Sequence, residues 1–160
     1  MERNVAVIGL ISDTHGLVRP EALRALGGSD LIVHAGDVGK PEILDALKLL
    51  APVVAVRGNI DRGGWASALP LTATVSAGLA AVYVLHDLQQ LDLDPAAAGF
   101  HVVVSGHSHK PSRTERGGVL YVNPGSAGPR RFQLPVMVAR LDLRQSPWKV
   151  EFIDLRTPIA

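Results

Sequence analysis

Cysteine, net charge and long apolar runs are scarce or absent in this chain of 160 residues. The absence of cysteine excludes disulfides, thiolate nucleophiles and cysteine-ligated zinc. Lys and Arg number 16 and Asp and Glu 15, so the net charge of +1 creates no field for strong nucleic-acid binding. Proline, glycine or charge interrupts every apolar run before about 18 residues, so we predict no transmembrane helix.

The remaining composition is that of a folded domain. With 47% hydrophobic and 19% charged residues, the chain can bury a core without disulfides or partners. No long polar or Pro/Gly-rich linker interrupts it, so we predict a single domain over residues 1–160. The first residues, MERNVAVIGLISDTHG, contain too short an apolar stretch for a signal peptide, and the expected localisation is cytoplasmic.

Short apolar segments alternate with proline-started helices in the first part of the chain. Val5–Ile11, Leu31–Ala35 and Pro52–Val56 are nearly continuous apolar runs, as in strands that are buried on both faces. Pro20–Leu26 and Pro41–Leu50 begin with proline, which suits the first position of a helix. This β-α-β-α-β order predicts right-handed crossovers and parallel strands.

The rest of the chain favours strands and hairpins. Leu71–Ser76 and Leu79–Leu85 read as one hairpin, and His101–Ser105 as a further short strand. We expect Asp87–Gly99 to be a connection with one or two helical turns. The remaining predicted strands are Arg113–Arg116, Val119–Val122, Val136–Leu143 and Trp148–Leu155.

Polar side chains and glycines follow each strand that reads as central. The carboxyl ends of strands in an α/β sheet meet at one edge, where ligands bind. Glycines beside the polar residues let the backbone turn sharply there. The loops therefore bring seven candidate ligands to one cleft: Asp13, His15, Asp37, Asn59, His86, His107 and His109.

The chemistry of these seven side chains points to metal ions. Two carboxylates, one amide and four imidazoles suit Mn²⁺, Fe or Zn²⁺ and are too rich in nitrogen for a Ca²⁺ or Mg²⁺ cage. Seven ligands are too many for one tetrahedral ion and suit two ions that share a carboxylate. Two ions about 3.5–4 Å apart can hold a bridging hydroxide that attacks phosphorus in line. The residues predict two divalent transition-metal ions and do not choose among Mn²⁺, Fe and Zn²⁺; Mn²⁺ is the ion that we expect.

Ordered motifs cover the chain from Val5 to about Leu143: VIGLISDTHG, LIVHAGDVG, VVAVRGNID, VYVLHD, VVVSGHSHKP and YVNPGSAGPR. In this order they resemble the calcineurin-like metallophosphoesterases, and more narrowly their small bacterial and archaeal phosphodiesterase branch. The resemblance implies an α/β fold, a four-layer α/β/β/α sandwich of two mixed sheets with a dinuclear centre at one edge. It also implies two ligand sets bridged by Asp37: one of Asp13, His15, Asp37 and His109, the other of Asp37, Asn59, His86 and His107.

Two positions depart from the family pattern. Ile60 stands where many members have a histidine that helps to protonate the leaving group, so the general acid has no assigned residue. Asp87 stands where many members have glycine; it either orients His86 through its second ring nitrogen or caps the next helix.

Arg62 is the arginine that we expect to bind the substrate phosphate. His34, inside a predicted strand, either supports the site or packs in the core.

The predicted function is a metal-dependent phosphodiesterase with a small-molecule phosphodiester as its substrate. We expect catalysis to depend most on Asp37, Asn59 and His107. Because no general acid is assigned, we expect aryl diesters to react far faster than alkyl diesters.

Two alternatives stay open: a phosphomonoesterase at the same site, and a catalytically weak, metal-binding interaction module, because the retromer scaffold subunit shares this fold. The sequence also leaves open the physiological substrate and whether the chain forms a homo-oligomer.

Overall fold

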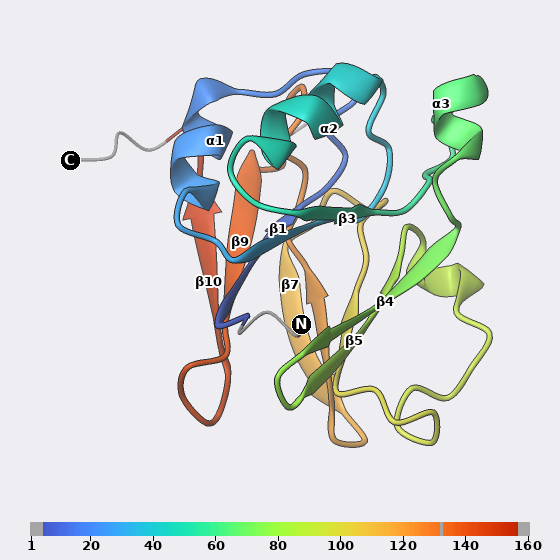
Figure 1. Cartoon of the computed structure of the whole chain (residues 1–160), viewed down its shortest axis with the longest axis vertical. Coiled ribbons are helices and arrows are strands. Elements are labelled where there is room, and N and C mark those ends of the chain that lie inside the picture. The colour runs from blue at the N-terminus through green and yellow to red at the C-terminus, as the bar shows by residue number, and fades with distance from the viewer. Residues whose placement is uncertain (1–4, 132, 157–160) are drawn as a thin grey trace.

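Two five-stranded sheets form the centre of the protein (Figure 1), as seen in a computed structural model that describes residues 5–131 and 133–156. The first sheet has the order β10-β9-β1-β2-β3. Its strands β1, β2 and β3 are parallel, β9 runs antiparallel to β1, and β10 runs antiparallel to β9. The bounds are β1 Val7–Ile11, β2 Leu31–His34, β3 Val53–Ala55, β9 Met137–Asp142 and β10 Lys149–Asp154.

The second sheet has the order β4-β5-β6-β8-β7. Strands β5, β6 and β8 are parallel, and β4 and β7 are antiparallel edge strands. The bounds are β4 Thr72–Ala77, β5 Ala80–Leu85, β6 Val102–Val104, β7 Ser112–Arg116 and β8 Val119–Asn123. Both sheets are mixed, which confirms the predicted fold class.

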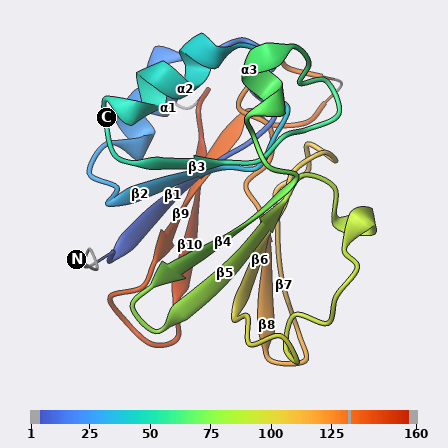
Figure 2. The same cartoon turned by 45° about the vertical axis from the view of Figure 1, so that its right-hand side comes forward.

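The central strands are buried on both faces, as their apolar sequences predict. Ile8 and Leu10 on β1 lie in the core between the two sheets. Ile11 lies in a second core beneath the helices α1 (Pro20–Leu26) and α2 (Pro41–Lys48). Figure 2 shows both helices on the outer face of the first sheet. Side chains that alternate between the two faces of a strand therefore join two cores into one body.

The outer face of the second sheet is covered differently from the α-helical layer that the resemblance implies. Residues 88–100 pack there as an irregular segment with one 3₁₀ turn, η1 (Leu88–Gln90). Its Phe100 packs against Tyr83 of β5 in a tilted arrangement, with ring centroids 5.1 Å apart. A four-residue helix, α3 (Gly64–Ser67), was not expected from the sequence. In the described part of the chain, no helix is long and apolar enough to cross a membrane.

Candidate metal centre

The candidate ligands lie in loops that follow the carboxyl ends of β1, β2, β3, β5 and β6. The backbone φ angles are positive at Asp13 (56°), His15 (48°), Asp37 (57°), His107 (70°) and His109 (63°). Within the described residues, no other non-glycine position has a positive φ. The left-handed conformation costs free energy for residues with a Cβ, and it persists where the surrounding structure holds it in place. The strained positions therefore coincide with five of the seven predicted ligands.

Glycines next to the ligands allow the loops to approach one another. A Cβ at Gly36 would lie 2.7 Å from His86 Nδ1. A Cβ at Gly58 would collide with the backbone nitrogen and the carboxylate of Asp37. These glycines are required because the neighbouring loop occupies the space of a side chain.

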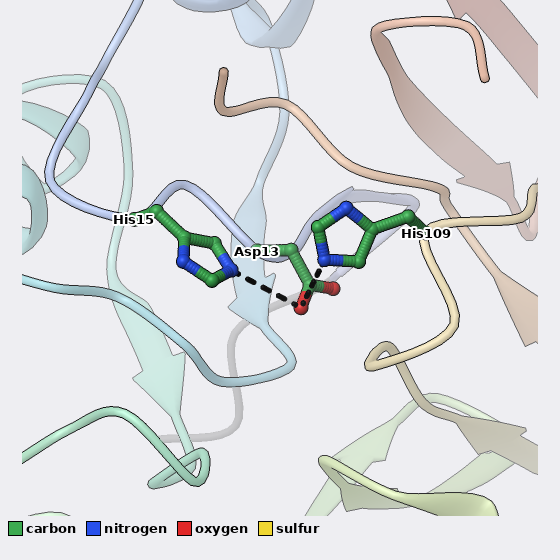
Figure 3. Close-up of side chains that lie close together, drawn as sticks. All are labelled: Asp13, His15 and His109. Carbon is green, nitrogen blue, oxygen red and sulfur yellow. Dashed lines mark ion pairs between the residues drawn. The ribbon is translucent and has the colours of Figure 1, made fainter. Parts of the chain in front are cut away.

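One carboxylate oxygen of Asp13 accepts hydrogen bonds, and the other accepts none from the described residues. Its Oδ2 accepts hydrogen bonds from Ser12 Oγ (2.7 Å) and from the backbone N–H of His107 (3.0 Å). Its Oδ1 is buried and accepts no hydrogen bond from the described residues. The ring nitrogens that face Oδ1 are the Nε2 atoms of His109 (3.5 Å), His15 (3.9 Å) and His86 (3.9 Å). Figure 3 shows the rings of His15 and His109 directed at this oxygen.

Asp37 has the same division of roles. Its Oδ1 accepts the backbone N–H of Ile60 at 3.1 Å. Its Oδ2 lies 3.4 Å from His15 Nε2 and 3.3 Å from His86 Nε2. These two histidines belong to different predicted ligand sets, so the Oδ2 atom of Asp37 lies between the two sets.

His86 is oriented by a backbone carbonyl. Its Nδ1–H donates to the carbonyl oxygen of Ala35 at 2.7 Å, which leaves Nε2 free to face the carboxylates. The hypothesis that Asp87 orients His86 is therefore wrong, because Ala35 occupies that role. The Asp87 carboxylate instead caps η1 by accepting the backbone N–H of Gln89 at 3.0 Å, as the alternative proposed. It also lies 3.8 Å from His107 Nε2.

Asn59 and His107 lie at the outer side of the cluster. The amide oxygen of Asn59 is 3.0 Å from His86 Nε2. The same atom lies 3.2 and 3.3 Å from the two carboxylate oxygens of Asp37 and 3.3 Å from His107 Nδ1. Exchanging the amide oxygen and nitrogen lets the Asn59 NH₂ group donate to the Asp37 carboxylate, to His86 Nε2 and to His107 Nδ1, so the amide nitrogen takes this position when no cation is bound. The side chain of His107 is 46% exposed, so this side of the cluster opens to solvent.

Burial and nearby charges shift the pKa values of the candidate ligands. Burial raises the pKa of Asp13, although the Ser12 hydrogen bond opposes this shift. Burial lowers the pKa values of His15 and His109, which favours neutral rings with a free electron pair. For His86, burial acts to lower the pKa, but the hydrogen bond with Asp37 and the nearby carboxylates raise it overall. For Asp37, burial acts to raise the pKa, but the contacts with His86 and Ile60 lower it.

The donor set fits bound divalent cations. Two groups have ligand atoms within 4.8 Å of one another: Asp13, His15 and His109, and Asp13, Asp37 and His86. Asp13 Oδ1 and His15 Nε2 are buried without a hydrogen-bond partner among the described residues. Unpartnered buried donor and acceptor atoms are costly, and a cation between them removes the cost. Oxygen and imidazole donors without sulfur are the ligands of Mn²⁺, Fe and Zn²⁺.

Two supporting side chains were not assigned a role from the sequence. Asp61 is buried and accepts three backbone N–H groups, from Val38 (3.2 Å), Gly39 (2.9 Å) and Gly58 (2.9 Å). It therefore ties the Asp37 loop to the Asn59 loop. Asn123 donates to the carbonyl oxygen of Gly106 (3.0 Å) and to Ser108 Oγ (3.1 Å), and so holds the His107–His109 loop. The Asn-Pro-Gly motif that begins at the last residue of β8 was the sequence signal for Asn123.

The arginines differ in their distance from the cluster. Arg57 lines a cavity together with Asn59, His86 and His107. The guanidinium of Arg131 lies 3.4 Å from His15 Nδ1. Arg62, the predicted phosphate ligand, is exposed and lies outside the lining of that cavity. The geometry favours Arg57 over Arg62 for contact with a substrate.

Comparison with known proteins identifies the family. The model of the calcineurin-like phosphoesterase superfamily domain matches residues 7–146. A probable metallophosphoesterase of Methanothermobacter thermautotrophicus is 40% identical over 148 residues, covering 85% of this chain and 86% of the relative. The chain belongs to the calcineurin-like phosphoesterase superfamily. The family predicted from the motifs is therefore confirmed. Proteins of this superfamily use divalent metal ions, in agreement with the donor groups found here.

Solved structures of this superfamily fold are similar to the chain at low sequence identity. An archaeal phosphodiesterase superposes with a TM-score of 0.76 at 20% identity, covering 92% of this chain and 99% of that one. Chaetomium thermophilum Vps29 also gives a TM-score of 0.76, at 19% identity, covering 92% and 97% of the two chains. At these identities the likeness establishes the fold alone.

Proposed function

We propose that this member of the superfamily is a dinuclear, metal-dependent phosphodiesterase, with Mn²⁺ as the preferred ion. The observation that carries the proposal is the Oδ1 atom of Asp13. It is buried, accepts no hydrogen bond from the described residues and is faced by three imidazole nitrogens. A buried carboxylate oxygen without a protein donor is expected where a metal ion completes its coordination. The fold shared with an archaeal phosphodiesterase also supports the proposal.

The two ligand sets meet at Asp37. In the proposal, one ion is held by Asp13, His15, Asp37 and His109, and the other by Asp37, Asn59, His86 and His107. The position of Asp37 Oδ2 within 3.4 Å of a histidine from each set supports its bridging role. When bound, two such ions lower the pKa of a shared water and neutralise charge on the phosphate oxygens.

The residues of the chain supply orientation. The Ala35 carbonyl fixes the His86 ring by accepting its Nδ1–H, so that Nε2 is presented to the site. Asp61 fixes the spacing between the Asp37 and Asn59 loops through three backbone hydrogen bonds. Because these partners are buried, the ligand atoms need little rearrangement when ions or substrate bind.

The chain offers no proton donor at the position of Ile60, whose side chain is apolar and 38% exposed. Without a general acid, a phosphodiester with a poor leaving group loses about 10²–10⁴-fold in rate. Aryl diesters therefore turn over far faster than alkyl diesters. Equal rates for bis-p-nitrophenyl phosphate and dimethyl phosphate would contradict this part of the proposal.

The test is hydrolysis of bis-p-nitrophenyl phosphate by protein that has been stripped of metal and reloaded with Mn²⁺, Fe²⁺ or Zn²⁺. We expect metal-dependent release of p-nitrophenolate that Asp37→Asn abolishes. Asp45→Asn is the matched control, because Asp45 is an exposed aspartate on α2. The same protein is assayed with p-nitrophenyl phosphate, a monoester with the same leaving group.

Each outcome separates the candidates. Turnover of the diester that requires metal and Asp37, with slower turnover of the monoester, supports the phosphodiesterase. Faster turnover of the monoester would make the protein a phosphomonoesterase. The third outcome is no turnover with any of the three metals in protein that is folded and binds metal. It would favour the alternative function, an interaction module of the same fold.

A further inference from the structure

A cavity of about 430 Å³ adjoins the candidate metal centre. It shares Asn59, His86 and His107 with the predicted ligands. Its other lining residues come from the loop after β3, the start of β4, the end of β5 and the segment around η1: Arg57, Gly58, Leu71, Thr72, Leu85, Asp87, Gln90 and Asp92. A substrate whose phosphate sits at the metal centre therefore has room for one of its ester groups in this cavity.

The size and the apolar part of the lining set the kind of group that fits. Cavities of this volume lie in the range that encloses molecules of about nucleoside size. Leu85 is buried in the wall, whereas Leu71 is 62% exposed and offers apolar surface that a ligand would cover. Thr72 and Gln90 add hydrogen-bonding groups that are uncharged. The lining suits a flat, uncharged group with a few polar atoms.

The charges of the lining disfavour a second phosphate. Asp87 and Asp92 are anionic, and Arg57 is the one cation among the lining residues. Arg57 is two positions from Asn59 and forms part of the same loop after β3. A second phosphate in the cavity would meet a lining with two carboxylates and one guanidinium group, and like charges repel.

We infer that this cavity is the binding site for one uncharged, nucleoside-sized ester group of the substrate, and that it rejects a group carrying a further phosphate. The inference rests on the proposed function for the position of the reacting phosphate. It adds the class of substrate: phosphodiesters that carry an uncharged aromatic or nucleoside group.

The test measures the binding of three ligands to Mn²⁺-loaded protein by calorimetry. Methyl phosphate places only a phosphate at the metal centre, thymidine 5′-monophosphate adds the nucleoside, and thymidine 3′,5′-bisphosphate adds a further phosphate. We expect the nucleoside to tighten binding about tenfold through buried apolar area. We expect the 3′-phosphate to cancel that gain, by about tenfold, through repulsion from the carboxylates.

Two variants connect the effects to the cavity. Leu71→Asp removes the preference for thymidine 5′-monophosphate and leaves the affinity for methyl phosphate unchanged. Leu79→Asp is its control, because Leu79 is 90% exposed at the β4–β5 turn and lies outside the cavity lining. Asp92→Asn restores most of the affinity for the bisphosphate. Unchanged affinity for methyl phosphate also shows that each variant is folded and holds its metal.

Equal affinities for the three ligands, or a nucleoside preference that survives Leu71→Asp, would overturn the inference. Hydrolysis of bis-p-nitrophenyl phosphate by the same preparation tests the proposed function separately. Hydrolysis without a nucleoside preference would refute the cavity assignment and leave the phosphodiesterase standing. A nucleoside preference without hydrolysis would uphold the cavity and refute the phosphodiesterase.

Discussion

His34 makes the stability of this protein sensitive to acid. Its ring is fully buried in β2 beneath the metal-site loops. Thr14 Oγ1 donates to the Val38 carbonyl (2.8 Å), so it accepts from His34 Nε2–H (3.0 Å). His34 Nδ1 accepts the backbone N–H of Gly36 at 3.1 Å. The contacts thus select one neutral tautomer, and burial lowers the pKa of His34 from 6.5 to about 3.

The sign and size of the effect follow from the two pKa values. Between pH 6.5 and about 3, the unfolded chain protonates this histidine and the folded chain does not. The unfolded state then binds more protons, so the free energy of unfolding falls as the pH falls. The contribution of neutral, buried His34 to the free energy of unfolding is fully present above pH 6.5. It declines by about 1.4 kcal/mol per pH unit below that pH. From pH 7 to pH 5 the loss is about 2 kcal/mol.

Urea unfolding of metal-free protein at pH 7 and pH 5 measures this loss. His34→Gln lowers stability at pH 7, because it removes a buried, hydrogen-bonded ring, but its further loss on going to pH 5 is about 2 kcal/mol smaller than in the wild type. His101→Gln, at an exposed histidine outside the metal-site loops, is the matched substitution measured beside it. The reasoning is refuted if wild type and His34→Gln lose the same free energy of unfolding between the two pH values.

Three substitutions test how the loops are held together. Gly58→Ala should abolish Mn²⁺ binding in a calorimetric titration, because its Cβ would collide with Asp37, whereas Gly64→Ala meets nothing within 4 Å and should bind normally. Asp61→Asn should lower the free energy of urea unfolding by about 2–4 kcal/mol, because three backbone N–H groups lose a charged acceptor. Asn123→Ala should cost about 1–3 kcal/mol in the same assay and weaken Mn²⁺ binding, because it frees the His107–His109 loop. Wild-type values for any of these variants would contradict the role assigned to that residue.

Much of the architecture could be predicted from the chain because its signals are local and repeated. Apolar runs such as Val5–Ile11 gave the buried strands, and prolines at 20 and 41 gave the starts of both main helices. The polar residues after each strand led to one edge of the sheets, where the structure brings Asp13 and Asp37 together with the histidines. Strand order places these loops side by side whatever their sequence separation, which is why a pattern at strand ends predicts a cluster.

Other features depend on partners that the sequence does not mark. The carbonyl of Ala35 orients His86, and no residue type signals a backbone acceptor 51 positions away. Asp61 was assigned no role from the sequence, yet its carboxylate is buried and accepts hydrogen bonds from three backbone N–H groups. His34 had two open interpretations until its contacts with Thr14 and Gly36 were known. The layer formed by residues 88–100 has too few periodic apolar residues to predict its packing against the second sheet.

The most direct test of the central claim is a calorimetric titration of metal-free protein with Mn²⁺. Two ions should bind per chain, and Asp37→Asn, which alters the carboxylate that we propose both ligand sets share, should weaken both. Asp45→Asn should bind as the wild type does. A single ion per chain, or binding that is unaffected by Asp37→Asn, would contradict a dinuclear centre built on this residue.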